Sequence, residues 1–307
     1  MNMDHESYIE LLDNLAWESP DTFLEDPAHR QGSGDGYTAH LAEKHCAWTI
    51  GELFARQIAE NKTDVSVFAS KDDMLDAITN FIAYYKEQIA VWVEKRPIEF
   101  NSPELYKRLI FEFDLGANDE DETLGYGVSS DGSIWYSSGI RMVLKRDNDP
   151  RNELGFYIED AYPLRKYAIF DKNECISPES IRNYELKPED KMKLTIDALR
   201  NESDAFKLYP KMTSKKVIHG GQPMIFLNVP VNEDQKLTLD CKEHGCEIKM
   251  FTYNEEGRSV KKQLTMDKIM DMSPELYDLF VKIDSYRHEI YNDRTALRNP
   301  VHEDEER

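Results

Sequence analysis

The sequence predicts an α+β protein, with N-terminal helices followed by an antiparallel sheet and then by a second α+β domain. Helical periodicity prevails up to about residue 95, and short runs of alternating apolar and polar residues follow it. The 307 residues suffice for two domains, and 40% hydrophobic with 11% aromatic residues excludes a disordered chain. We therefore expect an N-terminal helix and linker over 1–35, a first domain over 36–168, and a second domain of unassigned role over 169–307.

The first half is expected to begin with a short amphipathic helix around Tyr8–Leu15, followed by a Pro- and Gly-rich loop over 19–36. Its strongest signal is a core-facing helix over 71–95, where apolar residues recur every three or four positions. The other predicted elements are helices over 38–45 and 49–61 and strands over 65–68, 109–115, 141–146 and 155–162.

The pattern of the sequence changes after about residue 170. A helix is expected over 188–199, and a final helix should begin at Ser273-Pro274, with Ser as the cap and Pro at the first helical position. Between these helices, strands are predicted over 216–218, 224–229, 236–239 and 247–253.

The charge balance is strongly acidic. The chain has 38 Lys and Arg against 59 Asp and Glu, a formal net charge of −21. A surface of this charge repels polyanions, which excludes a broad basic platform for nucleic acid and any expectation of DNA binding. A small cleft can still concentrate positive potential locally. The candidate cations for such a field are Lys44, Arg56, Arg141, Lys145 and Arg146.

The chain carries no signal for a membrane or for an oxidising compartment. No apolar run approaches the roughly 20 residues of a membrane helix, and the N-terminus lacks the basic start of a signal peptide. Four cysteines in a chain this long do not form a disulfide framework. We expect a soluble protein of the reducing cytoplasm without a membrane partner.

No motif predicts a cofactor or a metal. The P-loop, the GxGxxG dinucleotide fingerprint and the GxSxG elbow are all missing from the sequence. Cys241, His244 and Cys246 are not a Cys-x-x-Cys pair, so a turn between strands is favoured over a zinc site. The acidic segment 119–122 is interpreted as a solvated loop rather than a cation site. The prediction is therefore no cofactor and no metal.

Two histidines and an arginine are candidates for proton and phosphate chemistry. His40 and His45 lie five residues apart, which turns their side chains about 140° from each other on a helix and excludes the i,i+4 pairing of a zinc site. They are either surface histidines at a helix end or groups available for proton transfer. Arg56 is either an exposed helix residue or a guanidinium whose donors match a phosphate.

A polar pair lies near the end of the last predicted strand of the first domain. Phe156, Ile158, Asp160 and Tyr162 alternate along that strand and are expected to share a face. Asp160 and Tyr162 then lie either at the mouth of a core or at a wet strand end.

An ordered series of short motifs resembles a known family, the RNase A-like toxin domain at the C-termini of bacterial CdiA proteins and other polymorphic toxins. The resemblance covers about residues 36–163. Its motifs are His40-Leu-Ala-Glu-Lys-His45, Glu52-Leu53 with Arg56, Phe68 to Asp73, Ile89-Ala-Val-Trp92, a Gly-Tyr-Gly-Val turn at 125–128, the basic strand 141–146 and the closing segment Gly155 to Pro163.

The resemblance implies an RNase A-like fold and a metal-independent ribonuclease that cleaves RNA, in some members tRNA, and is neutralised by an immunity protein. The family's catalytic histidine and arginine fall on His45 and Arg56, and its Thr-x-Tyr falls on Asp160 and Tyr162. Asp160 thus departs from the threonine of the family. A carboxylate near a phosphate is repulsive unless it is protonated or paired with a cation. His40 is a candidate for a second proton-transfer role.

Three hypotheses follow for function. The leading one is a toxin-like endoribonuclease that cuts RNA through attack by the 2′-hydroxyl and leaves a 2′,3′-cyclic phosphate. The alternative is a non-catalytic acidic interaction or immunity-type protein that keeps the fold, favoured by Asp160 and by the net charge of −21. The third is that residues 169–307 shield or guide the first domain.

Overall fold

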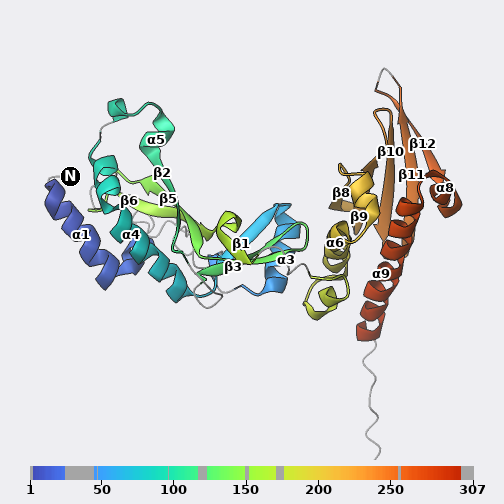
Figure 1. Cartoon of the computed structure of the whole chain (residues 1–307), viewed down its shortest axis with the longest axis horizontal. Helices are drawn as coiled ribbons and strands as arrows, with labels where there is room; N and C mark the ends of the chain where they lie inside the picture. Colours follow the sequence, from blue (N-terminus) through green and yellow to red (C-terminus); the bar gives the residue numbers. More distant parts are fainter. Residues whose placement is uncertain are drawn as a thin grey trace, which may run out of the picture. The chain divides into compact units, whose positions relative to one another are not determined.

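The structure, a computed structural model, describes residues 3–24, 45–46, 48–95, 97–116, 123–148, 152–170, 176–254 and 257–298 (Figure 1). The chain divides into two compact units that interleave along the sequence. The first unit takes 1–49, 64–128 and 134–174, and the second takes 50–63, 129–133 and 175–307. Each unit combines helices with antiparallel strands, which confirms the predicted α+β class.

The first unit contains two sheets, one of strand order β1-β3-β4-β7 and one of order β2-β5-β6. Its strands are β1 (Asp64–Phe68), β2 (Arg108–Asp114), β3 (Gly125–Ser129), β4 (Ile134–Ser137), β5 (Gly139–Arg146), β6 (Phe156–Pro163) and β7 (Ala168–Phe170). Its helical elements are α1 (His5–Glu18), η1 (Pro20–Leu24), α4 (Lys71–Glu94), η2 (Pro97–Glu99), α5 (Pro103–Lys107) and η4 (Arg165–Tyr167).

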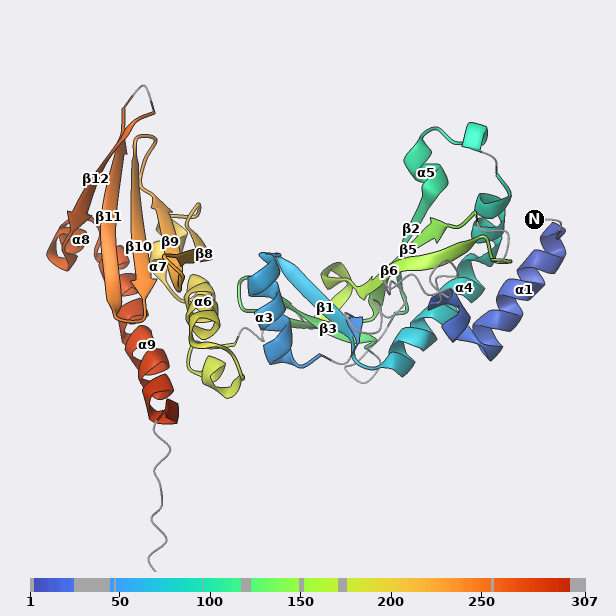
Figure 2. The same cartoon turned by 180° about the vertical axis from the view of Figure 1, so that it is seen from behind.

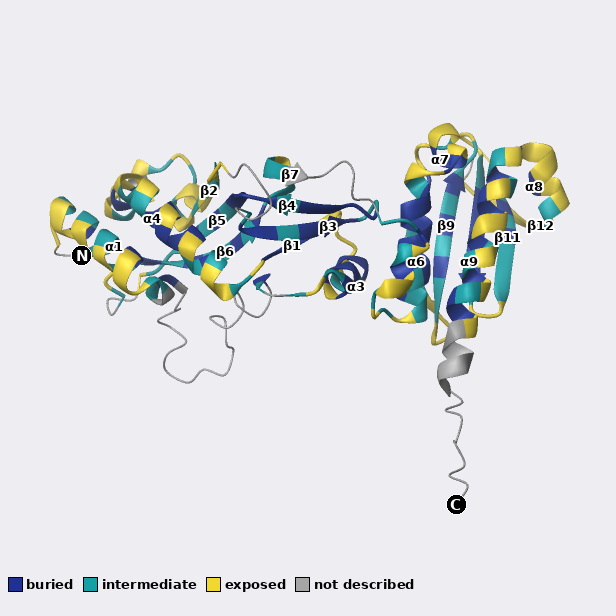
Figure 3. Cartoon of the chain, turned by 60° about the horizontal axis from the view of Figure 1, so that its bottom comes forward, coloured by how far each residue is buried: buried dark blue, intermediate teal, exposed yellow. Residues whose placement is uncertain are grey.

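Helix α4 holds the core of the first unit together and confirms the helix predicted over 71–95. Its start is capped by Ser70, whose Oγ accepts the Asp73 backbone N–H at 3.0 Å. One face carries fully buried residues such as Phe81, which meets Phe111 of β2 edge-on with ring centroids 5.3 Å apart. Helix α1 runs alongside α4 in both views (Figures 1 and 2), and Figure 3 shows the buried stripe of α4.

Two sequence expectations for the first unit are wrong. Residues 20–24, expected as loop, form η1, because Pro20 fits the start of a helical turn and Phe23 is fully buried. The Gly-Tyr-Gly-Val segment, expected as a turn, is strand β3, paired with β4. A Cβ at Gly125 would collide with the carbonyl oxygen of Val67, and one at Gly127 with the ring of Trp135. These glycines therefore serve close approach of neighbours to a strand, which a turn signal does not distinguish.

The second unit is built on one antiparallel meander of order β12-β11-β10-β9-β8. Its strands are β8 (Thr213–His219), β9 (Gln222–Pro230), β10 (Gln235–Lys242), β11 (Gly245–Tyr253) and β12 (Ser259–Leu264). Its helical elements are α3 (Ile50–Glu60), η5 (Ser180–Asn183), α6 (Pro188–Ala198), η6 (Leu199–Asn201), α7 (Asp204–Leu208), α8 (Met266–Met272) and α9 (Pro274–Arg298). Helices α6 and α9 contact each other and the sheet (Figure 3).

Helix α3 confirms the helix predicted over 49–61, and its contacts explain why it groups with the second unit. Phe54 is fully buried and meets Tyr184 with ring centroids 5.9 Å apart. The helix predicted over 38–45 falls almost entirely outside the described residues. Across the described part of the chain, no helix combines the length and the apolar character needed to cross a membrane.

Candidate functional site

Halfway along strand β6, the alternation of core-facing and outward-facing side chains is interrupted, and this interruption positions the candidate site. Phe156 and Ile158 are buried, and so is Ala161, whereas Asp160 and Tyr162 are only partly covered. The pairing of β5 with β6 shifts register between Val143 and Leu144, so β6 contains one extra residue at this point. A β-bulge of this kind turns the following side chains to the opposite face.

The expectation that Asp160 and Tyr162 share a face with Phe156 and Ile158 is therefore wrong. The strict alternation that predicted it is broken by the bulge. Asp160 and Tyr162 lie on the open face of the three-stranded sheet, opposite to the core. The bulge thus converts the end of a core strand into a surface that carries polar groups.

His45 contacts both of these residues. Its Nε2 lies 3.2 Å from Oδ1 of Asp160, and its ring stacks on Tyr162 with centroids 6.0 Å apart and an interplanar angle of 22°. The backbone is held in place because Cys46 forms a parallel bridge to Phe68 of β1. His45 is 8% exposed, so its ring has little freedom to leave this position. The structure therefore brings together three of the predicted site residues: His45, Asp160 and Tyr162.

The carboxylate that departs from the family threonine thus has an imidazole as its neighbour. A carboxylate beside an imidazole fixes the orientation of the ring and stabilises its protonated form. The contact places Asp160 beside a group that can accept and release a proton. Asp160 is therefore compatible with proton transfer by His45.

Arg141 and Glu112 extend the cluster across the sheet. Arg141 is the cross-strand partner of Tyr162 on β6 and of Glu112 on β2. Its Nη1 donates to the Tyr162 hydroxyl at 3.1 Å, and its Nε donates to Glu112 Oε1 at 2.9 Å. Hydrogen bonds from Lys166 and from Arg141 hold the pKa of the Glu112 carboxyl below its usual range. Arg141 was predicted only as part of a positive field and Glu112 not at all, because their contacts depend on strand register.

Arg56 lies on α3, which belongs to the second compact unit. Its side chain is 9% exposed, and its Nε donates to Glu60 Oε1 at 3.0 Å, one helical turn along. That Arg56 and His45 act in one active site stays a prediction. His40, the candidate for a second proton-transfer role, and Lys44 fall outside the described residues.

Cys241 and Cys246 lie in a hairpin of the second unit, which agrees with the expected turn between strands. Cys241 on β10 and Cys246 on β11 are direct cross-strand partners. The acidic segment 119–122 lies outside the described residues. Within the ranges that the structure describes, no group of three or more His, Cys, Asp or Glu is arranged to hold a metal ion.

Comparison with known proteins identifies a family for the segment that contains this cluster. Residues 39–163 match the model of the bacterial CdiA-CT RNase A domain, which confirms the resemblance predicted from the sequence over this segment. The matched segment contains His45, Asp160 and Tyr162. No curated protein matches the chain.

A solved structure, the crystal structure of a CdiA-CT/CdiI complex from Y. kristensenii, is similar at 20% sequence identity and a TM-score of 0.33. The similarity covers 41% of this chain and 98% of the other.

Proposed function

We propose that the first unit is a metal-independent endoribonuclease of the CdiA-CT type. The observation that carries this proposal is the cluster of His45, Asp160 and Tyr162 inside the segment that matches the RNase A domain family. RNA cleavage needs a base for the 2′-hydroxyl proton, stabilisation of the charge on the phosphorane, and an acid for the leaving 5′-oxygen. The chain has residue types for each of these tasks.

The contacts support a role for each of His45, Asp160 and Tyr162. His45 transfers the proton, and Asp160 positions its ring through Nε2. The Tyr162 hydroxyl accepts a hydrogen bond from Arg141, so its own proton is available to donate to a phosphate oxygen or to the leaving oxygen. The assignments of Arg56 to the equatorial phosphate oxygens and of His40 to the second proton transfer rest on the sequence alone and stay predictions. The products are a 2′,3′-cyclic phosphate and a free 5′-hydroxyl.

The biological setting follows from the family resemblance. The substrate is RNA, with tRNA among the candidates, in the cytoplasm of a target cell, and an immunity protein neutralises the activity. No cofactor takes part in the proposed reaction.

The second candidate is a non-catalytic acidic interaction protein that keeps the fold. The observation in its favour is that Asp160 stands where the family has threonine, on a chain of net charge −21. One assay separates the two candidates: the full chain is incubated with tRNA in excess EDTA, and the product termini are analysed. We expect cyclic phosphate termini. Intact RNA at high protein concentration and low salt would favour the interaction protein.

The variant His45→Ala should lower the cleavage rate by about 10²–10⁴-fold, the range that proton transfer contributes. His5→Ala is a matched control, because His5 is also an imidazole paired with carboxylates, Glu94 at 2.7 Å and Glu87 at 3.2 Å. Thermal unfolding checks that both variants fold. Cleavage that survives His45→Ala at the level of His5→Ala would contradict the proposed mechanism.

A further inference from the structure

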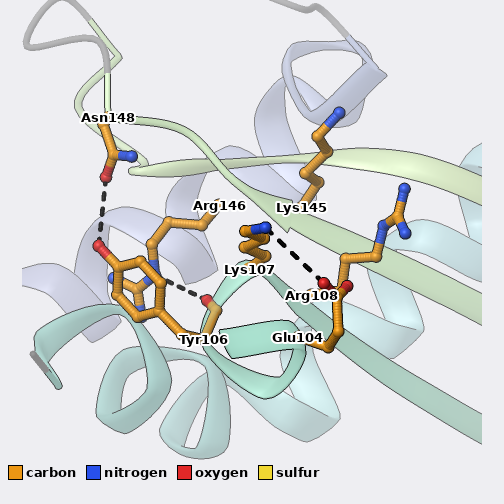
Figure 4. A pocket seen from close by; sticks show the side chains of 7 residues that line it. All are labelled: Glu104, Tyr106, Lys107, Arg108, Lys145, Arg146 and Asn148. Atoms are coloured by element: carbon orange, nitrogen blue, oxygen red, sulfur yellow. Dashed lines mark hydrogen bonds and ion pairs between the residues drawn. The ribbon is translucent and has the colours of Figure 1, made fainter. Parts of the chain in front are cut away.

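A cationic pocket lies in the first unit where α5, β2 and β5 meet (Figure 4). Its volume is about 250 Å³. Four of its lining side chains are cations and one is a carboxylate: Lys107, Arg108, Lys145 and Arg146, and Glu104. On a chain of net charge −21, such a gathering of cations is a local exception.

The cations are only partly neutralised. Glu159, beside the pocket, accepts a bidentate pair from Arg108 and lies 3.3 Å from Lys145, so one carboxylate serves two cations. Lys107 Nζ is 3.7 Å from Glu104, with 63% of its side chain exposed. The result is an excess of positive charge with exposed ammonium groups.

Arg146 adds charge that backbone groups, not a carboxylate, hold in place. Its guanidinium donates to the carbonyl oxygens of Tyr106, Val93 and Trp92. It lies over the rings of Trp92 at 4.7 Å and Tyr106 at 4.3 Å. Figure 4 shows Arg146 and Tyr106 on one side of Lys107, with Arg108 and Lys145 on the other. Arg146 is thus a fixed cation at the wall of the pocket.

The Lys145 side of the pocket and the candidate site share one face of the same sheet, whereas Arg146 points to the other face, toward helix α4. Along β5, Arg141, Val143 and Lys145 are partly exposed, whereas Met142 and Leu144 are fully buried, so Arg141 and Lys145 point to the same side. Four residues along a strand span roughly 14 Å. Arg141 contacts Tyr162 at the site end, and Lys145 lines the pocket at the other end.

Between the two ends, the surface is apolar on the β2 side of Val143, whereas on the β6 side Val143 pairs with Asp160. Ile110 of β2 pairs with Val143 of β5, and Ile110 is 57% exposed. An apolar patch between two groups of phosphate-binding donors suits a ribose or a base, while the backbone phosphates meet the cations at either end. This layout favours a nucleic acid strand over a small free anion as the ligand.

We propose that this pocket binds a backbone phosphate of the RNA substrate, on the strand that continues away from the cleaved bond. The proposal rests on the proposed function and adds the path that the substrate takes. Lys107 and Lys145 supply the exposed positive charges, and Arg108 and Arg146 add to the positive potential of the pocket.

The test is a binding measurement on the full chain with a labelled single-stranded 2′-O-methyl oligonucleotide, which cannot be cut because it lacks the 2′-hydroxyl. The variant K107Q/K145Q removes the two exposed pocket charges. The control K207Q/K268Q removes two lysines that are 71% and 67% exposed, against 63% for Lys107 and 41% for Lys145. Each control lysine is paired with an aspartate three residues away, as Lys107 is with Glu104. Thermal unfolding checks that both double variants fold.

We expect K107Q/K145Q to weaken binding about threefold to tenfold at low salt, and to reduce the slope of log affinity against log salt by about 0.7 per lost phosphate contact. An affinity and a salt slope equal to those of the control would overturn the proposal that this pocket binds a phosphate. Unchanged RNA binding with weakened binding of a purified immunity protein would assign the pocket to a protein interface and also overturn the proposal. The His45→Ala cleavage assay decides the proposed function separately.

A different observation concerns the second unit. Cys241 and Cys246 face each other across β10 and β11, and the Cys246 thiol donates to Cys241 Sγ at 3.4 Å. Directly opposed residues of an antiparallel pair have Cβ atoms about 4.5–5.5 Å apart, close to the separation that a disulfide bridges. Cys241 is buried, whereas Cys246 is partly exposed and lines a cavity of about 390 Å³.

The geometry points to a reversible disulfide between Cys241 and Cys246, formed by exchange with a small disulfide such as oxidised glutathione. The Cys246 thiolate attacks one glutathione sulfur and releases one glutathione. The hydrogen bond with Cys246 and burial raise the pKa of the Cys241 thiol, so it is the slower group of the two. It gives up its proton to the released glutathione thiolate, and its sulfur then attacks the Cys246 sulfur and releases the second glutathione. Two protein thiols are oxidised, one glutathione disulfide is reduced to two thiols, and the two protein protons pass to the released thiolates.

Intact mass measures the reaction on the full chain. Excess oxidised glutathione should lower the mass by two hydrogens, and Cys241→Ser should instead keep glutathione on Cys246. Cys46→Ser is the control, because the Cys46 thiol contacts Met74 Sδ at 3.5 Å rather than the sulfur of a second cysteine. A wild-type mass that does not change, or a loss of two hydrogens that persists in Cys241→Ser, would overturn this disulfide.

Discussion

The two units use charged side chains in opposite ways. In the second unit, the ion pair of Lys193 and Asp197 is buried, with 7% and 2% of the side chains exposed. In the first unit, Arg141 and Asp160 are 38% and 39% exposed, on the open face of a sheet beside an imidazole. Buried pairs are already satisfied by their partners, whereas exposed ones can exchange a partner for a ligand. The contrast favours the first unit as the reactive one.

The largest expected effect is on stability, in the second unit. Lys193→Met leaves Asp197 buried with Ser214, whose hydroxyl donates to it at 2.5 Å, as its remaining described hydrogen-bond partner. Burial already raises the pKa of the Asp197 carboxyl, and loss of the nearby cation adds to that cost. We expect a loss of about 3–5 kcal/mol in the free energy of unfolding, measured with urea.

The double variant K193M/D197L is the control, because it removes both charges and should recover most of the loss. A single variant as stable as the wild type would contradict the structural role of the pair. RNA cleavage per folded molecule should remain unchanged in both variants.

The next effect is on cleavage, in the first unit. Tyr162→Phe keeps the ring that stacks on His45 but removes the hydroxyl that faces Arg141. Loss of one donor to a developing oxyanion costs about 10²–10³-fold in rate, so we expect kcat to fall by about 10²-fold with a small change in stability. Tyr157→Phe, on the same strand, is the matched control. Equal rates for the two variants would exclude Tyr162 from the reaction.

Asp160→Asn should have a smaller effect. The amide keeps the size of the side chain and can still contact His45 Nε2, but it carries no charge to stabilise the imidazolium. We expect kcat to fall by about tenfold to a hundredfold, because the ring is less well positioned, while KM for RNA does not rise. Asp160→Thr restores the family residue, and a kcat above that of the wild type would show that the carboxylate hinders the reaction.

The sequence predicted elements whose signal is local. The helix over 71–95 is confirmed, because its apolar period and its Ser70 cap both lie within the segment itself. The β12 strand was missed because its residues are exposed, so no apolar alternation marks it. The predicted orientation of Asp160 was wrong because a β-bulge depends on the pairing with the partner strand, which the sequence of β6 alone does not specify.

Only part of the candidate site was predictable from the sequence. The choice of His45, Asp160 and Tyr162 came from the family resemblance, and the structure places these three residues in contact. Glu112 had no signal of its own, since its role rests on being opposite Arg141 across β2 and β5. Contacts between strands far apart in sequence are set by register, which composition and periodicity do not reveal.

The smallest expected effect compares two similar carboxylates, one in each unit. Glu112 is bridged by Lys166 and Arg141, and Glu247 is bridged by Lys249 and Lys242. These hydrogen bonds lower the pKa of Glu112, and they lower the pKa of Glu247 to about 2. Because the folded-state pKa lies below the unfolded value, the stabilisation is present above about pH 4.5 and is lost as the pH falls toward 2. Both side chains are partly exposed, 25% for Glu112 and 42% for Glu247, so solvent screens their ion pairs and each contributes less than about 1 kcal/mol.

Glu112→Gln and Glu247→Gln should therefore change the free energy of unfolding equally little at pH 7, and not at all near pH 2. Only Glu112→Gln should alter cleavage, because Glu112 holds Arg141 beside the Tyr162 hydroxyl. We expect a severalfold fall in kcat, up to the tenfold cost of one misplaced hydrogen bond, with Glu247→Gln at the wild-type rate. The measurements are urea unfolding at several pH values and RNA cleavage at pH 7. Equal cleavage by the two variants would mean that the ion pairs of Glu112, like those of Glu247, have a structural role and no role in cleavage.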